Sequence, residues 1–253
     1  MVSLRPVVRP IALAGSIVLV AAGCAGASTS PAASANVVAS VEPSVAPSPS
    51  IAASPSVAPS PTTAPSASAS GAAIPLCAKE FTACSLEAGT YSATPFDPAF
   101  DFTIAGPWQN DRAWPDGGEI AMADGAIQWA SGVTTGFKQG LGNPGTPIGP
   151  KPADFIDYLE SFKGFTVTDP VPVTIDGTTG QQIDVSTNDT GVHGFFVITH
   201  DAFNVDAGEK IRFYVLDKGG KTVILTMDSF KADGFDAFAK VAQPVIDSIK
   251  WES

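Results

Sequence analysis

The spacing of hydrophobic positions changes along the chain. Residues 11–22 form one apolar segment, residues 25–73 show no period, and the alternation typical of strands begins at residue 89. From there the alternation recurs in short segments bounded by Pro, Gly or Asp-Gly: 89–93, 100–104, 119–123, 126–130, 165–167, 171–175, 180–186, 195–199, 210–217 and 221–227. The pattern therefore predicts a C-terminal region rich in strands.

Two segments of this region show helical spacing. The first begins at Pro152 and places four apolar side chains on one face: Phe155, Ile156, Leu159 and Phe162. The second begins near Gly234 and carries Phe235, Phe238, Val241, Ala242, Val245 and Ile246. Strands combined with two helices predict an α+β fold, in which an antiparallel or mixed sheet is covered by two main helices.

The clearest hairpin joins residues 210–217 to residues 221–227 through Lys218-Gly219-Gly220. Its first strand places Ile211, Phe213 and Val215 on one face. The expected match for them on the second strand is Val223, Leu225 and Met227.

The N-terminus has the features of an export signal. Arg5 and Arg9 precede the apolar segment, and Ala22-Gly23 supply the small residues that a signal peptidase requires. The segment is shorter than the roughly 20 apolar residues that span a bilayer. Ala21-Ala22-Gly23-Cys24 resembles the lipobox of bacterial lipoproteins, although Leu is usual where Ala21 stands. The resemblance implies a signal peptide over residues 1–23 and lipidation of Cys24; the alternative is ordinary secretion with a free thiol.

Residues 24–73 are predicted to be a disordered linker. They are almost entirely Ala, Ser, Pro, Val and Thr, and such a composition buries too little apolar surface to fold. The linker would act as a spacer between the membrane and a single α+β domain over residues 74–253.

Charge narrows the range of partners. The chain has 14 Lys and Arg against 25 Asp and Glu, and two of the basic residues lie in the signal peptide, so the mature net charge is 12 − 25 = −13. An acidic surface gains nothing from counterion release, which argues against nucleic acid or anionic lipid headgroups as partners.

Cys77 and Cys84 are predicted to form a local disulfide, because two thiols seven positions apart in an exported domain most simply pair with each other. A metal site would need further soft ligands close by in the sequence, and none is present. No metal and no cofactor are therefore expected.

The order of the expected strands and helices resembles that of a known family. Residues 100–104 followed by Gly106-Pro107-Trp108, the middle helix, the late hairpin and a closing helix that ends in Ile246-Asp247-Ser248-Ile249 are similar to the PsbP/Mog1-type sandwich of LpqN-type lipoproteins. The resemblance implies a domain used for binding rather than catalysis, and its motifs assign no functional residue.

Catalytic signals are weak. The two histidines, His193 and His200, stand near Asp189 and Asp201, but no Gly-x-Ser-x-Gly nucleophile elbow occurs. The acidic segments 184–189 and 201–209 lack the spacing of a calcium loop. The protein is therefore predicted not to be an enzyme.

Aromatic residues give the candidate ligand site. Trp108 and Trp114 lie among polar residues, and Phe137 lies in a Gly- and Pro-rich stretch over residues 131–150. The three side chains are predicted to line a site at one end of the sheet, where they would stack on a sugar or a flat apolar ligand. The alternative is that the tryptophans belong to the core.

These patterns predict a lipoprotein anchored at the extracytoplasmic face of the bacterial cell membrane. Its domain is expected to bind a small apolar or glycan ligand, or an envelope protein, without catalysis. The alternatives are a cell-envelope hydrolase and a structural docking module.

Overall fold

The computed structural model describes residues 72–77, 82–137, 145–162, 164–187 and 195–252. Its largest element is a nine-stranded sheet in the order β10-β12-β15-β16-β7-β6-β5-β2, with β11 pairing beside β12. The strands of this sheet are β2 (Cys84–Leu86), β5 (Trp108–Trp114), β6 (Gly117–Met122), β7 (Gly125–Ser131), β10 (Phe165–Val167), β11 (Val171–Ile175), β12 (Thr178–Thr187), β15 (Lys210–Lys218) and β16 (Lys221–Ser229). All of its ladders are antiparallel.

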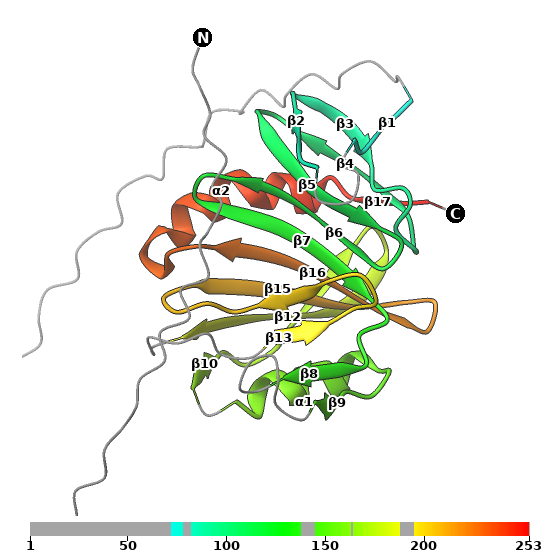
Figure 1. Cartoon of the computed structure of the whole chain (residues 1–253). Coiled ribbons are helices and arrows are strands. Elements are labelled where there is room, and N and C mark those ends of the chain that lie inside the picture. Colours follow the sequence, from blue (N-terminus) through cyan, green and yellow to red (C-terminus); the bar gives the residue numbers. More distant parts are fainter. Residues whose placement is uncertain (1–71, 78–81, 138–144, 163, 188–194, 253) are drawn as a thin grey trace, which may run out of the picture. The chain divides into compact units, whose positions relative to one another are not determined.

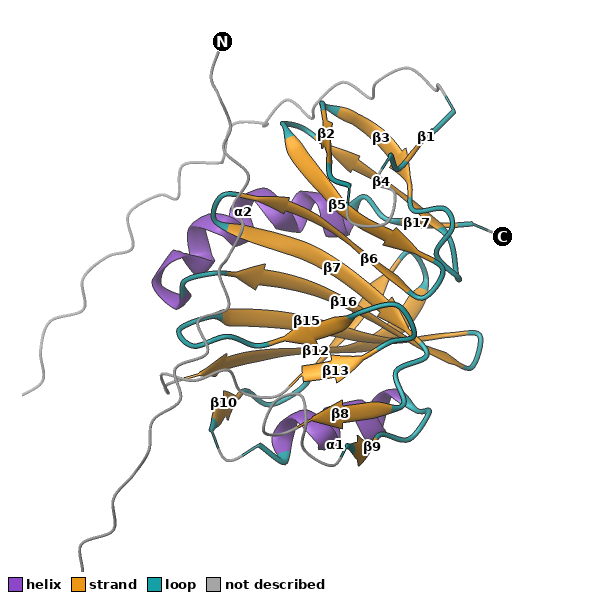
Figure 2. Ribbon diagram, in the orientation of Figure 1, coloured by secondary structure: helices purple, strands orange, loops and turns teal. Residues whose placement is uncertain are grey.

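Two smaller sheets accompany it (Figure 2). The terminal sheet, in the order β1-β3-β4-β17, consists of β1 (Ile74–Pro75), β3 (Gly89–Ser92), β4 (Phe100–Ile104) and β17 (Lys250–Trp251). The short sheet, in the order β14-β13-β8-β9, consists of β8 (Thr135–Phe137), β9 (Thr146–Pro147), β13 (Phe195–Val197) and β14 (Ala202–Asn204).

Two α-helices, α1 (Pro152–Glu160) and α2 (Phe235–Asp247), complete the described part of the chain, with a 3-10 turn at Ala232–Gly234 before α2. Figure 1 shows α1 together with β8 and β9 on one side of the nine-stranded sheet and α2 on the other. Each helix therefore shares its side of the large sheet with one of the small sheets.

Two hydrophobic clusters hold these layers together. The first joins α2 and the terminal sheet to one face of the large sheet through Phe102, Trp129, Leu225, Phe238 and Ile246. The second joins α1 and the short sheet to the opposite face through Phe155, Leu159, Ile183, Phe203 and Phe213. The central strands β7, β15 and β16 have side chains in both clusters, so this part of the large sheet is buried on both faces.

The predicted fold class is wrong in its layering. Most of the ordered structure is strand, and the two helices do not by themselves cover the sheet. The reason is width: eight strand positions at about 4.8 Å spacing span roughly 34 Å, whereas one helix is about 10 Å across. The terminal sheet and the short sheet cover the surface that the helices leave open.

The terminal sheet holds both ends of the domain. Its strand β1 pairs with β3 in parallel, and β17 pairs with β4. Asp176, in the turn between β11 and β12, binds β17 by accepting hydrogen bonds from Trp251 N and Lys250 Nζ, both at 2.9 Å. The last strand is thereby fixed to the large sheet.

Candidate functional site

A β-bulge in β5 determines how the candidate residues face. The ladder between β5 and β6 pairs Asn110 with Ile120 and then Arg112 with Glu119, so Asp111 is an extra residue on β5. The buried Asn110 side chain fixes this geometry, because its Nδ2 donates to the carbonyl oxygens of Arg112, at 2.9 Å, and Glu119, at 3.0 Å. The extra residue reverses the alternation of side chains along β5.

Trp108 and Trp114 consequently face opposite sides of the large sheet. Trp108 is 4% exposed and packs against Phe238 of α2 in the first cluster. Trp114 is 7% exposed and stacks on His200, with ring centroids 6.2 Å apart. They also lie at the two ends of a seven-residue strand, about 20 Å apart at 3.3 Å per residue.

Phe137 ends β8 in the short sheet, where it is half-buried and pairs with Phe195 of β13. The structure therefore does not bring Trp108, Trp114 and Phe137 together in the single predicted site. Both tryptophans are core residues, which is the alternative that the sequence left open.

The bulge instead builds a polar group of side chains, the Arg112 cluster, on the face of the sheet that carries α1. Its members are Asp111, Arg112, Glu119, Gln128 and Asp201. Glu119 Oε2 accepts a hydrogen bond from Gln128 Nε2 at 2.8 Å, and Arg112 Nη1 donates to Asp201 Oδ2. Three of these residues come from adjacent strands in register, Arg112 opposite Glu119 and Glu119 opposite Gln128.

Burial and charge act against each other in the Arg112 cluster. Glu119 is 8% exposed, and burial raises the pKa of its carboxyl group even though Arg112 opposes the shift. Burial likewise raises the pKa of Asp111, against the opposing charge of Arg112. Burial disfavours the charge on Arg112, but Glu119 and Asp201 outweigh it and raise the pKa of the guanidinium. The cluster thus favours a charged arginine beside carboxyl groups that retain protons more readily than usual.

This balance predicts how stability depends on pH. A carboxyl group whose pKa is raised by folding stabilises the fold below its unfolded pKa, and that contribution is lost as the pH rises through the folded pKa. Glu119→Gln should therefore raise the thermal midpoint by a few degrees at pH 8 and leave it close to wild type at pH 4. Thermal unfolding followed by circular dichroism across this range measures the difference.

The exposed Glu160 of α1 provides the control, since Glu160→Gln should change the midpoint little at either pH. A Glu119→Gln protein that is less stable than wild type at pH 8 would show that the attraction of Arg112 outweighs the burial of the carboxylate.

A second group of contacts joins the β5–β6 turn to the segment between β13 and β14. Asp116 accepts hydrogen bonds from Thr199 N and from His200 Nδ1, both at 2.6 Å. The next residue, Asp201, is the partner of Arg112. This segment therefore brings His200 and Asp201, which lie far along the chain, beside Arg112 and Trp114.

The Asp116–His200 pair has the form of a base and its orienting carboxylate, but in the described residues no serine, threonine or cysteine side chain hydrogen-bonds to His200. His193 lies outside the described residues. Within the described ranges, no group of three or more His, Cys, Asp or Glu side chains is placed to hold a metal ion. The chemistry that the group offers is hydrogen bonding and charge pairing.

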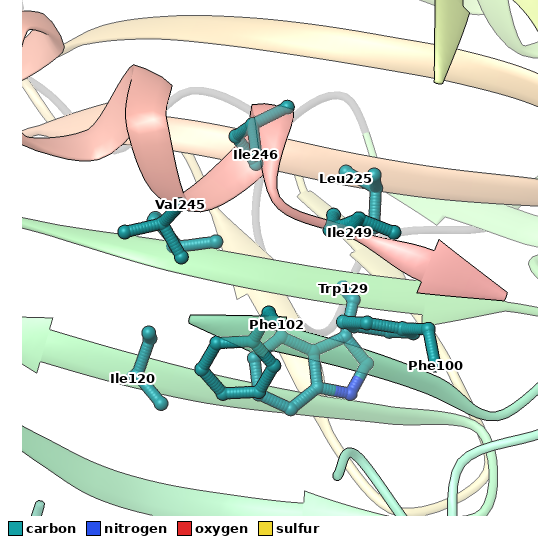
Figure 3. A pocket seen from close by; sticks show the side chains of 9 residues that line it. Phe100, Phe102, Ile120, Trp129, Leu225, Val245, Ile246 and Ile249 are labelled. Atoms are coloured by element: carbon teal, nitrogen blue, oxygen red, sulfur yellow. The ribbon is translucent and has the colours of Figure 1, made fainter. Parts of the chain in front are cut away.

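The first hydrophobic cluster contains a small cavity between α2, β4 and the large sheet. Its volume is about 10 Å³. Figure 3 shows Phe102 and Trp129 on the strand side and Val245 and Ile246 on the helix side, and the full lining is Phe100, Phe102, Ile120, Ile127, Trp129, Leu225, Val245, Ile246 and Ile249. A volume of this size admits one water molecule at most, because a single water needs roughly 10–15 Å³.

The predicted disulfide is confirmed. Cys77 and Cys84 are bonded, with their Cα atoms 6.2 Å apart, and the bond connects the end of the segment that follows β1 to the first residue of β2.

Cys24, the predicted lipidation site, lies outside the described residues. Of the helices that the structure describes, none is long and apolar enough to cross a membrane.

Sequence reasoning missed the Arg112 cluster although a signal was present. Residues 109–112 are four consecutive polar residues between two buried tryptophans, and such a run interrupts the alternation expected of a strand. Asp201 could not be found in this way, since only the path of the β13–β14 segment brings it to Arg112.

Comparison with known proteins finds neither a matching family model nor a matching curated protein. Among solved structures, a protein of Bacteroides thetaiotaomicron aligns with a TM-score of 0.35 and 11% identity over 66% of this chain, and the chain spans 50% of that protein. Cyanobacterial PsbP from Synechocystis aligns with a TM-score of 0.34 and 10% identity, over 66% of this chain and 93% of that protein. PsbP is thus among the similar structures, but similarity at this level does not enter the arguments below.

Proposed function

We propose that this chain is a membrane-anchored lipoprotein whose domain binds a ligand or partner outside the cytoplasmic membrane without catalysing a reaction. The structural observation that carries the location is the disulfide between Cys77 and Cys84, because such bonds persist in oxidising compartments. It agrees with the signal-like residues 1–23 and the lipobox-like Cys24, which were inferred independently.

The anchor is the lipid on Cys24. At about 0.8 kcal/mol per buried methylene, one acyl chain gives only marginal membrane binding, whereas several chains on one residue hold a protein firmly. Residues 24–73 then separate the anchor from the domain.

The cavity beside Trp129 is too small for an apolar ligand. Ligand pockets usually enclose roughly 300–1,000 Å³, far more than the about 10 Å³ of the cavity beside Trp129. A docking patch is equally unsupported, since the exposed large hydrophobic residues of the described chain are Ile74, Val171 and Val241, which lie on three different elements. The Arg112 cluster is the remaining candidate, and it suits a polar ligand.

A cell-envelope hydrolase is the second candidate, because Asp116 and His200 form the pair that a nucleophilic mechanism would use. No serine, threonine or cysteine side chain of the described residues hydrogen-bonds to His200, which is why binding is preferred. Activity against wall substrates that disappears in His200→Ala would favour the hydrolase.

Cys24→Ala tests the anchor. The wild-type chain should fractionate with membranes, whereas the variant should be released in soluble form, because the lipid is its only proposed attachment. The measurement is immunoblotting of the membrane and soluble fractions of the expressing bacterium. Cys77→Ala/Cys84→Ala is the matched control and should remain in the membrane fraction. A Cys24→Ala chain that stays membrane-bound contradicts the anchor.

The binding role is tested on the same material. Native mass spectrometry of the full chain, extracted in mild detergent, should detect bound mass that denaturation removes. A bare polypeptide mass, together with no crosslinked partner in intact cells, contradicts it.

A further inference from the structure

The bulge gives β5 an arrangement that a regular strand cannot have. Asp111 and Arg112 follow each other in sequence, yet both interact with Glu119 on the neighbouring strand. In a regular strand successive side chains point to opposite faces. Bulges of this kind recur beside binding and catalytic sites, where they redirect a side chain.

Arg112 retains hydrogen-bonding capacity. A guanidinium has five N–H donors, and among the described residues Arg112 uses only Nη1, which donates to Asp201. Its side chain is 32% exposed, and Asp111 beside it is half-buried. A ligand can therefore reach donors on Arg112 and acceptors on Asp111 from the same side.

The charges select the kind of ligand. The cluster holds three carboxyl groups, on Asp111, Glu119 and Asp201, against one guanidinium, so an anionic ligand would be repelled. An apolar ligand would leave the guanidinium donors unsatisfied at a desolvation cost. A hydroxyl group both donates and accepts, and two neighbouring hydroxyls fit an acceptor placed next to a donor.

His200 adds a flat surface beside these groups. Its side chain is 44% exposed, it stacks on Trp114, and it precedes the Asp201 that binds Arg112. Because Trp114 covers one face of the ring, only the other face is open to a ligand. A sugar residue can place its C–H face on such a ring and its hydroxyls on neighbouring polar groups.

We propose that the Arg112 cluster binds the hydroxyl groups of a neutral sugar residue, with Arg112 donating to them and Asp111 accepting from them. The proposal rests on the proposed binding function and names its site and ligand class. It differs from the site predicted from sequence, because it depends on the bulge and on Asp201 rather than on Trp108 and Phe137.

Isothermal titration calorimetry of the full chain in mild detergent tests it with named probes. The neutral probes are maltotetraose, chitotetraose and mannotetraose, and the charged probe is tetragalacturonate. At least one neutral probe should bind, and tetragalacturonate should bind more weakly than that probe or not at all. Arg112→Lys should weaken binding at least about ten-fold, which corresponds to the loss of one charge-assisted hydrogen bond.

Arg212→Lys is the matched control. Arg212 also pairs with a carboxylate, through Nε and Nη2 to Asp184 at 2.7 and 3.0 Å, but it lies on β15 away from the cluster and its replacement should leave sugar affinity unchanged. Asp111→Asn is a second test that preserves shape at a half-buried position, and it should weaken binding without lowering the thermal midpoint.

The proposal is wrong if no neutral probe binds, or if Arg112→Lys and Asp111→Asn both bind the sugar as wild type does. Neither result contradicts the proposed function. That function is tested separately, by the Cys24→Ala fractionation and by the mass that co-purifies with the chain.

Discussion

Trp129→Ala is expected to lower the free energy of unfolding by about 3–5 kcal/mol, the usual cost of deleting a large buried aromatic side chain. Trp129 is 2% exposed and contacts Phe100 edge-to-face at 5.6 Å and Phe102 at 6.1 Å between ring centroids. It lies where β4 of the terminal sheet meets the large sheet. Removing the indole would enlarge the present cavity, so both transfer energy and packing contacts are lost.

Urea unfolding followed by far-ultraviolet circular dichroism measures this change. Val241→Ala on the exposed side of α2 is the control and should stay within about 0.5 kcal/mol of wild type. Among the described residues the indole Nε1 of Trp129 has no hydrogen-bond partner, so no lost hydrogen bond complicates the comparison. A loss below about 1 kcal/mol would mean that the terminal sheet contributes little to stability.

Cys77→Ser/Cys84→Ser should cost about 2–3 kcal/mol, because the disulfide closes a short ring that limits the unfolded chain. The bond also attaches β2, which has only three residues, at the edge of the large sheet beside β5. Urea unfolding gives the energy, and hydrogen exchange should show faster exchange of the β2 amides in the variant.

The wild-type protein with its disulfide reduced provides the comparison, since it has the same open chain without a substitution. If reduction and substitution both leave stability unchanged, the ring contributes nothing and β2 is held by its ladder alone.

Local pattern was a good guide to strands and helices. The segments 100–104, 171–175 and 210–217 lie in β4, β11 and β15, and helices start at Pro152 and Phe235. These elements are marked by alternation or helical spacing bounded by Gly, Pro or Asp-Gly, and such signals depend on neighbouring residues only. The disulfide was predictable for the same reason.

The pairing register of strands was harder to predict from the sequence. The late hairpin turns through two residues, Gly219 and Gly220, both with positive φ, so Lys218 pairs with Lys221. Phe213 therefore lies opposite Thr226 rather than beside Leu225 and Met227, which face the other cluster. The predicted match of the two apolar sets is wrong, because a shift of one residue reverses the face of every side chain.

Contacts between segments far apart in the sequence were the hardest to predict. Nothing near Arg112 in the sequence announces Asp201, and the two small sheets are assembled from strands far apart in the chain, such as β8 with β13 and β4 with β17. The bulge at Asp111 belongs to the same level, since it is held by Asn110 contacts across two strands.

The disulfide would have a mechanical consequence under the lipid anchor proposed above. Tension in the proposed spacer would enter at β1, whose ladder with β3 spans two residues. Beyond it the Cys77–Cys84 bond would transmit the load covalently to β2. Because Cys84 pairs with Asn110, a pull on the proposed anchor would reach β5, the strand that holds Asp111 and Arg112.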